Sequence, residues 1–337
     1  MSKETIVVIG AGVIGLSTAL CIQQHLTPTQ SILLVAREFP SETSVNYASP
    51  WAGAHYRPVP GSSPQALKEA SQAQRTYEFL KRTAAAEPGA GIKFVEGVEH
   101  LEAPPPEYLD QQSVSNVYSH VDGFQMLGKE EVPVGVVWGV KYGTYVINSP
   151  VYWGETRQYT LANVKEAFSM AGNVKTVVNC SGSGFEDPKS FIIRGQTCLV
   201  RNPVSKTITR QNTDGSWSFC IPRPLEGGTI IGGTKEPNNW DPNPSLETRQ
   251  RLLANAAKWF PFTPESDGQF DVIRDIVGRR PARDGGLRIE AEKLADDVYI
   301  VHGYGAGGRG FELSRGVAED IVAVMLEKRL LQAKASL

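Results

Sequence analysis

Residues 10–15 read Gly10-Ala11-Gly12-Val13-Ile14-Gly15, and this stretch decides the fold. It lies between a short apolar run at residues 5–9 and a segment with helical spacing of apolar residues at 13–24. Glycines in this pattern permit a tight turn, the close approach of a pyrophosphate and close packing of the helix. The sequence therefore predicts a strand, a turn and a helix that bind a dinucleotide, with the helix N-terminus facing the anion.

A second apolar run at residues 31–36 completes a βαβ unit, which predicts a parallel sheet at the N-terminus. This run ends in Val35-Ala36-Arg37-Glu38, so the acid that usually accepts the ribose hydroxyls is not at its expected place. Arg37 stands there instead. It would suit the 2′-phosphate of NADP, but a solvated charge at the end of a strand explains it equally well. The fingerprint alone leaves the dinucleotide open.

Composition excludes several classes of protein. With 337 residues, 41% of them hydrophobic and 21% charged, the chain has enough apolar material for two intertwined domains. Its net charge of −2 gives no general attraction to nucleic acid or to anionic membranes. The scattered cysteines form no Cys-x-x-Cys pair and the histidines do not cluster, so we expect buried free thiols and no metal site. These cysteines are Cys21, Cys180, Cys198 and Cys220.

Both ends of the sequence bear on the compartment. Met1-Ser2-Lys3-Glu4-Thr5 leads directly into the first strand and lacks the features of a signal peptide. No run of about 18 apolar residues predicts a membrane span. The last residues, Ala335-Ser336-Leu337, end in leucine like a peroxisomal signal but lack its basic penultimate residue. We expect an intracellular protein, either cytoplasmic or peroxisomal, without a nucleic-acid or membrane partner.

Later segments extend the pattern of the N-terminus. Helical spacing recurs at 62–83, 246–259 and 311–331, and strand-like runs recur at 176–180 and 299–302. Further alternating runs between them are typical of an antiparallel sheet. The predicted fold combines α/β and α+β parts: a Rossmann-type domain built from separated segments, interleaved with an antiparallel-sheet domain.

Six separated motifs together resemble the fungal D-amino acid oxidase family, in the order of that family. The resemblance runs from residue 6 to about 325, and the family also has an Ala-Arg pair after its second strand, so it implies FAD as the cofactor. The motifs are Ala48-Ser49-Pro50-Trp51-Ala52-Gly53-Ala54, Ile193-Arg194-Gly195-Gln196-Thr197, Ile221-Pro222-Arg223-Pro224, Gly232-Gly233-Thr234, Gly278-Arg279-Arg280-Pro281-Ala282-Arg283 and His302-Gly303-Tyr304-Gly305.

The resemblance implies domain ranges and cofactor contacts. We expect residues 1–60, 150–195 and 285–337 to bind FAD, and residues 61–149 and 196–284 to bind substrate. Besides residues 10–15, the expected FAD contacts are Arg37, Thr43, Ser44, Gly53, Ala54, Ser181, Gly182, Gly305, Gly307, Gly308, Gly310, Phe311 and Glu312. The last of these lead into the final helix, whose amides and dipole stabilise negative charge on the flavin.

The implied reaction is the oxidative deamination of a D-amino acid to a 2-oxo acid, ammonia and hydrogen peroxide. In the family an arginine of the Arg-Pro-x-Arg segment holds the substrate carboxylate, and this arginine is Arg280 here. The flavin carries the chemistry, so no general base and no metal are expected. The partners are the small-molecule substrate and oxygen, and a homodimer is compatible with the sequence.

Several positions depart from the family. Phe219 stands where the family has a tyrosine that helps to hold the substrate carboxylate, and Tyr56 is a substitute donor. Lys235 follows Gly233-Thr234, where D-aspartate oxidases similarly carry a basic residue, so acidic substrates are expected to be preferred. His55 and Arg57 add charge to the same pocket, and Gly308 is assigned to the substrate as well as to FAD.

One segment is shorter than the resemblance implies. After Val151-Tyr152-Trp153-Gly154 the family continues into a full helix, whereas here Glu155-Thr156-Arg157-Gln158 arrives about a dozen residues early. Two alternatives to the oxidase stay open, the first of them because of this shortening and of Phe219. One is a specialised or degenerate flavoprotein of the same family that acts on another amine. The other is an NAD(P)-dependent reductase that uses the same Rossmann half.

Overall fold

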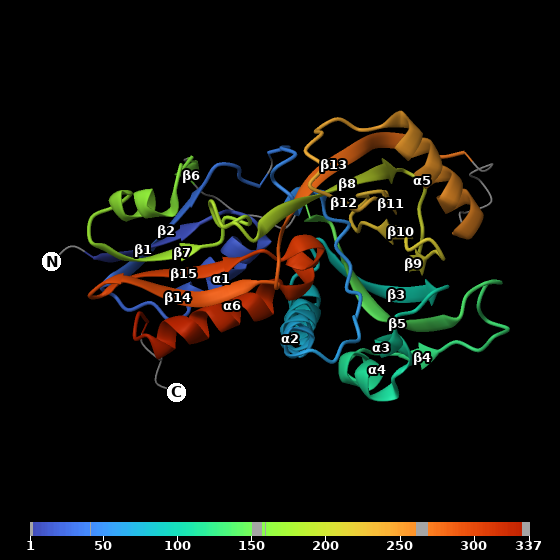
Figure 1. Cartoon of the computed structure of the whole chain (residues 1–337), viewed down its shortest axis with the longest axis horizontal. Helices are drawn as coiled ribbons and strands as arrows, with labels where there is room; N and C mark the ends of the chain where they lie inside the picture. Colours follow the sequence, from blue (N-terminus) through green and yellow to red (C-terminus); the bar gives the residue numbers. More distant parts are fainter. Residues whose placement is uncertain (1–2, 41, 150–156, 159, 261–268, 332–337) are drawn as a thin grey trace. The chain divides into compact units, whose positions relative to one another are not determined.

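The computed structural model describes residues 3–40, 42–149, 157–158, 160–260 and 269–331, and the chain divides into two compact units (Figure 1). Unit 1 consists of Met1–Pro50, Trp153–Ile193 and Arg279–Leu337, and unit 2 consists of Trp51–Tyr152 and Arg194–Gly278. Each unit is assembled from separated segments of the chain. Residues 51–60 fall in unit 2 and residues 279–284 in unit 1, which differs from the ranges expected from the sequence.

Unit 1 is built on a six-stranded sheet. Its strands are β1 (Glu4–Ile9), β2 (Gln30–Ala36), β6 (Arg157–Gln158), β7 (Val174–Asn179), β14 (Arg288–Ala295) and β15 (Val298–Tyr304). They lie in the order β14-β15-β7-β1-β2-β6, and all neighbours are parallel except β14 and β15. β1 lies inside the sheet because its apolar residues Ile6 to Ile9 are buried on both faces, as parallel strands require.

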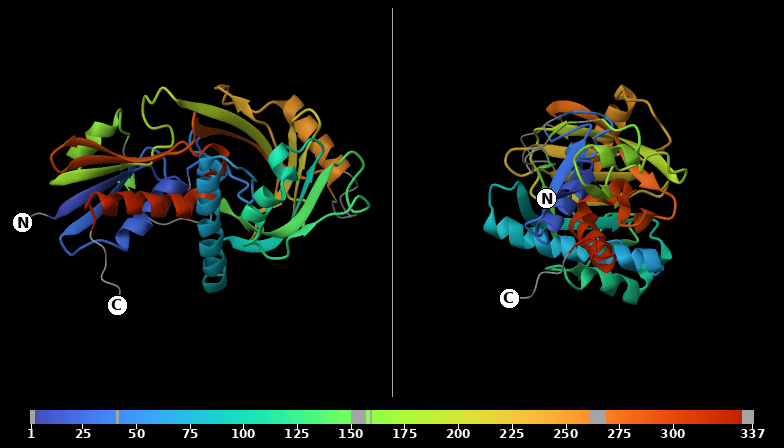
Figure 2. Two further views of the ribbon diagram at one scale, coloured as in Figure 1. Left: turned by 60° about the horizontal axis from the view of Figure 1, so that its bottom comes forward. Right: turned by 90° about the vertical axis from the view of Figure 1, so that its left-hand side faces the viewer.

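Helices cover both faces of this sheet (Figure 2). α1 (Val13–Gln23) and α6 (Gly310–Glu327) lie on one side, where a Cβ added to Gly303 of β15 would lie 2.3 Å from Ile321 Cδ1 of α6. The 3-10 helix η3 (Val164–Ser169) lies on the other side, and its Ala167 packs in a core cluster with Val7 of β1. The inner strands β1, β7 and β15 are therefore buried between helices.

The predicted shortening after Val151 lies largely outside the described residues, which omit 150–156 and 159. What is described is the strand that follows: β6 pairs in parallel with the end of β2, Val35 with Arg157 and Ala36 with Gln158. The C-terminal residues 335–337, considered above as a targeting signal, also lie outside the described residues.

Unit 2 contains most of a nine-stranded sheet. Its strands are β3 (Ile92–Leu101), β4 (Gln125–Met126), β5 (Trp138–Ile147), β8 (Ser190–Val200), β9 (Thr207–Gln211), β10 (Trp217–Pro222), β11 (Thr229–Gly232), β12 (Glu236–Pro237) and β13 (Val272–Arg283). The order is β12-β8-β11-β10-β9-β3-β5-β4, and β13 pairs with β8. β3 and β9 are parallel, whereas the pairs β3–β5, β4–β5, β9–β10, β10–β11 and β8–β11 are antiparallel. The predicted combination of a Rossmann-type part and a second, sheet-based part is confirmed.

The described helices of unit 2 are α2 (Pro64–Ala86), α3 (Pro106–Leu109), α4 (Gln111–Tyr118) and α5 (Leu246–Trp259). All except α3, which follows Pro105, begin at a polar cap that the sequence supplies. Ser63 caps α2 by accepting from the Ala66 amide, and Ser245 caps α5 by accepting from the Thr248 amide. Leu252 of α5 packs on the sheet in a cluster with Cys220 and Ile231. The helices predicted at 62–83 and 246–259 are confirmed.

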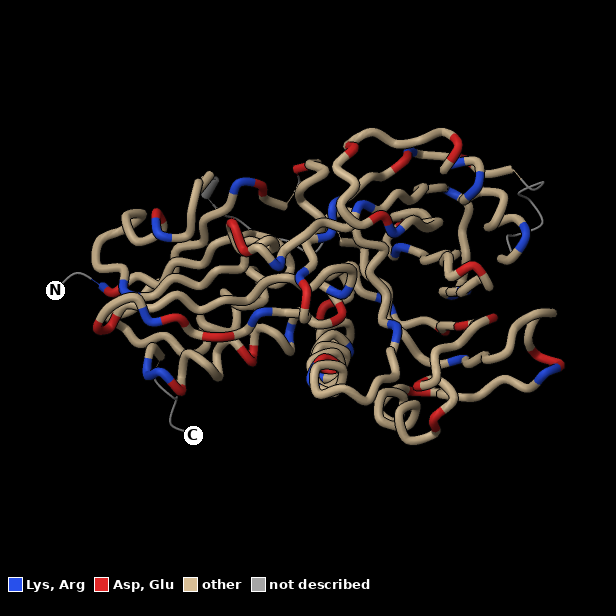
Figure 3. Tube along the Cα trace, in the orientation of Figure 1, with Lys and Arg blue, Asp and Glu red and all other residues tan. Residues whose placement is uncertain are grey.

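Charge is distributed along both units. Basic and acidic residues both occur in each unit (Figure 3), and the longest stretch of one sign is acidic, from Glu96 to Asp122. Among the helices that the structure describes, none combines the length and apolar composition needed to cross a bilayer. Within the same residues, no three cysteine, histidine or acidic side chains gather in a way that could hold a metal ion.

All four cysteines are free and buried, as the sequence predicts. Burial raises the pKa of Cys21 and Cys198 to about 11, and that of Cys180 and Cys220 to about 12. Thiols of this kind stay protonated at neutral pH and are poor nucleophiles. The cysteines are therefore packing residues of the two cores.

Candidate active site

The glycine turn joins β1 to α1 in unit 1. Gly10 has a φ of +99°, a conformation that L side chains rarely adopt, and its amide donates to Val35 O at 2.8 Å. A Cβ at Gly10 would lie 2.3 Å from Cys180 O, and one at Gly15 would lie 1.9 Å from Gly10 O. The turn is therefore closed so tightly that these two positions accept only glycine.

The N-terminus of α1 and the turn before it each contact a residue of the segment after β2. Gly12 caps the helix without a side-chain hydrogen bond, and the Val13 amide donates to Ser49 Oγ at 3.0 Å. The Tyr47 hydroxyl donates to Ala11 O at 2.6 Å and so holds the turn from behind. Sequence reasoning missed both Ser49 and Tyr47, because neither residue shows in the sequence which amide or carbonyl it reaches.

The end of β2 carries the charges considered for ribose recognition. Arg37 Nε donates to Glu38 Oε1 at 2.8 Å, and the Ser44 hydroxyl donates to the same oxygen at 3.1 Å. The Arg37 side chain is 54% exposed, whereas that of Glu38 is 18% exposed. Glu38 therefore supplies a carboxylate near the position where the fingerprint expects one. Thr43 is exposed and lies beside this group in the chain.

The loop after β7 lies beside the glycine turn because β1 and β7 are parallel neighbours whose carboxyl ends meet. A Cβ at Gly10 would lie 3.3 Å from Ser181 Cα. Within the loop, Gly182 has a φ of +84° and the Gly184 amide donates to Ser181 Oγ at 3.0 Å. The structure thus brings the expected contacts Ser181 and Gly182 to the carboxyl edge of the sheet, where α/β folds bind nucleotides.

The residues after β15 reach the same edge. Gly305, with a φ of +94°, donates its amide to Gly182 O at 3.0 Å, and Gly307 has a φ of +58°. Gly310 begins α6, and a Cβ there would lie 3.5 Å from Val13 Cγ1, so the two helix N-termini are close. Phe311 is buried, and the buried Glu312 accepts hydrogen bonds from Arg309 at 2.7 and 3.0 Å.

These features fit a dinucleotide such as FAD. The glycine turn leaves no side chain at Gly10, Gly12 or Gly15, and α1 begins there with its partial positive charge. The N-terminus of α6 adds a second helix dipole at the same edge. A pyrophosphate needs this combination of close approach and backbone donors, so the residues present suit the predicted cofactor.

Arg280 is the candidate anchor for the substrate carboxylate. It lies near the end of β13, within unit 1, and its side chain is half-buried. A Cβ at Gly308 would lie 3.6 Å from Arg280 Cδ, so the arginine stem runs along Gly308. The structure therefore brings together the two unit 1 residues that the sequence assigned to substrate.

Gly53, Ala54 and Phe219 lie in unit 2. A Cβ at Gly53 would lie 2.9 Å from Ile221 Cδ1, and Ala54 has a φ of +45° with its carbonyl accepting from the Ile147 amide. The Phe219 ring packs against Gly232, where a Cβ would lie 2.1 Å from its Cζ. Phenylalanine at this position thus fills the space that the glycine of β11 leaves.

Lys235 is exposed at the start of the loop after β11. The loop is held by Arg194, which pairs with Glu236 at 3.0 Å and donates to Asp241 O at 2.8 Å. Arg194 is 3% exposed, so this clamp is a buried one. The arginine of the Ile193-Arg194-Gly195 motif therefore fixes the loop that presents the Lys235 ammonium group.

His55, Tyr56 and Arg57 have different environments. Burial and the neighbouring Arg57 charge lower the pKa of His55 to about 3, so this side chain is neutral at neutral pH. The Tyr56 hydroxyl is hydrogen-bonded to His120 Nε2 at 2.9 Å, and Tyr56 is 1% exposed. Arg57 Nη1 donates to Glu99 Oε1 at 2.8 Å, and the Glu99 side chain is fully buried. Glu99 thus balances the Arg57 charge.

A cavity of about 400 Å³ opens beside Arg57 in unit 2. Its walls include Val59, Leu101, Tyr108 and Trp217. The Arg57 guanidinium lies 4.7 Å from the centre of the Trp217 ring, and its Nη1 also donates to the Tyr108 hydroxyl at 2.9 Å. The cavity is therefore a mixed aromatic and polar one.

Known proteins match this sequence over nearly its whole length. A sequence model described as FAD dependent oxidoreductase matches residues 5–167 and 146–324. A D-aspartate oxidase of Talaromyces thermophilus is 45% identical over 95% of this chain and 95% of its own length. A D-amino-acid oxidase of Schizosaccharomyces pombe is 32% identical over 97% of this chain and 99% of its own.

Solved structures resemble the fold at lower sequence identity. Glycine oxidase from Bacillus cereus superposes with a TM-score of 0.69 at 15% identity, and the match covers all of both chains. At this identity the likeness shows the fold alone.

Proposed function

Because this chain belongs to the family of FAD-dependent oxidoreductases, we propose that it oxidises D-amino acids and that acidic D-amino acids are its preferred substrates. The substrate, oxygen and water give a 2-oxo acid, ammonia and hydrogen peroxide. The observation that carries the proposal is the 45% identity to a D-aspartate oxidase over 95% of both chains. The family is FAD-dependent, so the NAD(P)-dependent alternative has lost its basis.

Unit 1 is the FAD-binding domain and unit 2 the substrate-binding domain in this proposal. Bound FAD supplies the chemistry, because it accepts the Cα hydrogen with its electron pair and passes the electrons to oxygen. Residues 10–15 and the N-terminus of α1 hold the pyrophosphate. Glu38 would accept hydrogen bonds from the ribose hydroxyls, and residues 305–310 with the N-terminus of α6 would stabilise negative charge on the flavin.

Arg280 binds the substrate carboxylate. A guanidinium offers two parallel N–H donors that match the two carboxylate oxygens, which fixes the orientation of the substrate as well as its position. Its stem packs along Gly308, which lies in the glycine-rich segment before α6. The protein's main contribution to rate is this orientation of the Cα–H bond.

Preference for an acidic side chain rests on Lys235. His55 is neutral at neutral pH and Arg57 is balanced by Glu99, so neither adds net positive charge. Lys235 is exposed on a loop that the buried Arg194 holds in place. An ammonium group presented in this way favours a second carboxylate on the substrate over an apolar side chain.

Lys235→Ala should therefore penalise acidic substrates selectively. The loss of a hydrogen bond to a charged group costs about 1.5–3 kcal/mol, so kcat/KM for D-aspartate should fall roughly ten- to a hundredfold. The value for D-alanine should change little. Steady-state kinetics with both substrates give the ratio, and Lys93→Ala, which removes an exposed lysine of β3, is the matched control. An equal loss for both substrates would contradict the role of Lys235.

An anaerobic spectral titration tests the function itself. The holoprotein should show oxidised-flavin absorption that bleaches when D-aspartate or D-glutamate is added, and less readily with D-alanine. L-aspartate should leave the spectrum unchanged. A yellow protein that no D-amino acid bleaches would favour the specialised flavoprotein that acts on another amine, an alternative that Phe219 keeps open.

The proposed chemistry bears on the location of the protein in the cell. Hydrogen peroxide is a product, so a peroxisomal or cytoplasmic site close to peroxide-removing enzymes suits the reaction. The functional partners are small molecules, and a homodimer is the assembly to look for by light scattering.

A further inference from the structure

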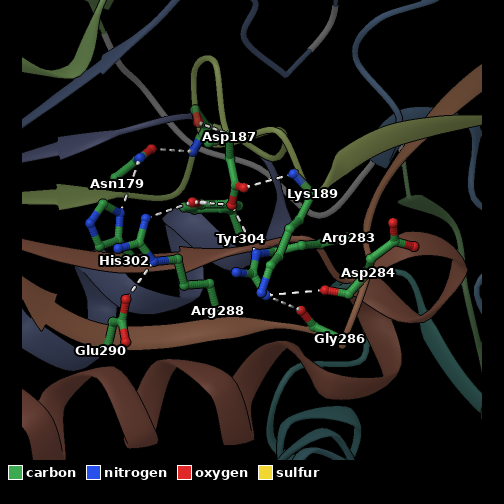
Figure 4. Close-up of polar contacts among 12 residues, drawn as sticks. Asn179, Asp187, Lys189, Arg283, Asp284, Gly286, Arg288, Glu290, His302 and Tyr304 are labelled. Atoms are coloured by element: carbon green, nitrogen blue, oxygen red, sulfur yellow. Dashed lines mark hydrogen bonds and ion pairs between the residues drawn. The ribbon is translucent and has the colours of Figure 1, made fainter.

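Asp187 is the centre of a partly buried polar network in unit 1 (Figure 4). Its Oδ2 accepts hydrogen bonds from Arg283 Nε at 2.8 Å and from the Tyr304 hydroxyl at 2.7 Å. Its Oδ1 accepts from the Lys189 amide at 2.9 Å. Burial by itself raises the pKa of Asp187, but these hydrogen bonds outweigh it and hold the pKa well below its usual range. Asp187 is therefore an anion at every physiological pH.

The network ties together three segments that are distant in the sequence. Asp187 lies in the loop after β7, Arg283 ends β13 and Tyr304 ends β15. Glycines let the segments approach closely, because a Cβ at Gly184 would lie 2.1 Å from the Tyr304 ring and one at Gly305 would lie 2.7 Å from Arg283 Cβ. The ion pair and the close packing therefore act on the same three segments.

A second guanidinium extends the network outward. Arg288 Nη1 donates to the Tyr304 hydroxyl at 3.0 Å, and Arg288 Nε donates to Glu290 at 2.6 Å. His302 Nε2 lies 3.1 Å from Glu292, and the His302 ring reaches back to Asn179 at the end of β7. The Tyr304 hydroxyl thus accepts a hydrogen bond from Arg288 and donates one to Asp187, which also pairs with Arg283.

Each of the three segments also carries a residue assigned to the site. Gly182 O, five residues before Asp187, accepts from the Gly305 amide, and Ala282 bridges Ala306 in the chain after Tyr304. Arg280 lies three residues before Arg283, with its stem against Gly308. A shift of Arg283 or Tyr304 would therefore move Arg280 and the glycines after β15 together.

We propose that Asp187, Arg283 and Tyr304 are positioning residues that hold Arg280 and residues 305–308 in the geometry that substrate carboxylate binding requires. This inference rests on the proposed oxidation of D-amino acids. The three side chains act through Arg280 and do not touch the substrate. A misplaced anchor weakens binding even when the cofactor is retained, because carboxylate recognition depends on the direction of both N–H donors.

The test uses the holoproteins of Asp187→Asn and Tyr304→Phe. Asp187→Asn removes the negative charge, and Tyr304→Phe keeps the ring against Gly184 but removes the hydroxyl. FAD content and thermal midpoint are measured first. The KM for D-aspartate and the Kd for malonate, a dicarboxylate without an amino group, should then each rise roughly ten- to a hundredfold in the FAD-loaded fraction. The kcat at saturating substrate should change much less.

Glu319→Gln is the matched control, because it removes another ion pair of unit 1, with Arg315 on α6, outside the network. It should leave KM and the malonate Kd unchanged. Wild-type values of both constants in loaded Asp187→Asn and Tyr304→Phe would overturn the positioning role, even if those variants unfold more readily. A wild-type holoprotein that neither bleaches with D-amino acids nor binds malonate would overturn the proposed function as well, which distinguishes the two failures.

Discussion

Arg280→Gln is expected to lower kcat/KM for D-aspartate by roughly 30- to 4,000-fold while FAD stays bound. Removing one partner of a desolvated, hydrogen-bonded charge pair costs about 2–5 kcal/mol, and each 1.4 kcal/mol is about tenfold. Glutamine keeps much of the packing along Gly308 but loses the charge and the paired donors. Steady-state kinetics and the flavin spectrum of the purified variant measure the two parts of this expectation.

The neighbouring arginine provides a sharp control. Arg279 Nη1 donates to Asn46 Oδ1 at 2.7 Å, and the Arg279 amide donates to Val45 O, so the side chain and the backbone of Arg279 each have a partner within unit 1. Arg279→Gln removes the same charge from the next position of β13 and should leave kcat/KM close to the wild-type value. Arg280→Lys should recover only part of the loss, because one ammonium cannot reproduce a two-donor contact. Near-normal kinetics for Arg280→Gln would remove Arg280 as the anchor.

Local patterns made the nucleotide-binding half predictable. The runs at residues 5–9, 13–24 and 31–36 correspond to β1, α1 and β2 because their apolar spacing and the glycine turn act over short distances. The helix predicted at 311–331 begins one residue earlier and ends at Glu327. Helix and strand signals of this kind need no knowledge of the rest of the fold.

Strands that depend on distant partners were not predicted. β14 reads Arg-Ile-Glu-Ala-Glu-Lys-Leu-Ala, with charged residues at half its positions, and it is an edge strand that pairs only with β15 in the described part of unit 1. β3 likewise lies between β9 and β5, and its sequence carries no sign of either partner. Such segments become strands because a neighbour supplies hydrogen bonds, and a neighbour is a property of the fold.

The charge state of the candidate site also depends on partners that are distant in the sequence. His55 and Arg57 were expected to add positive charge, which is a sound reading of the residue types. Glu99 of β3 lies 42 residues from Arg57 in the sequence and pairs with it, and burial keeps His55 neutral. The positioning role of Asp187 was missed for a similar reason, since its partners Arg283 and Tyr304 lie 96 and 117 residues away.

Gly15→Ala is expected to abolish most FAD binding. Alanine is the better helix former, by roughly 1 kcal/mol in a helix interior, so α1 taken alone would be stabilised. The added methyl group, however, would lie 1.9 Å from Gly10 O, a backbone atom of the turn that holds the pyrophosphate. Either the turn or the helix must move, and overpacking of this kind costs roughly 1–3 kcal/mol. Flavin absorption relative to protein absorption measures the loss in the purified variant.

A second glycine of unit 1 separates the clash from a general effect of alanine. A Cβ at Gly172 would meet no atom within 4 Å, so Gly172→Ala should bind FAD like the wild type. Titration of FAD into both apoproteins gives the two affinities, and urea unfolding gives the two stabilities. If Gly15→Ala loses FAD affinity and Gly172→Ala does not, the cofactor binds at the turn, because Gly10 O of the turn is the atom closest to the added methyl group. Wild-type FAD affinity in Gly15→Ala would mean that the pyrophosphate does not depend on the spacing between Gly10 and α1.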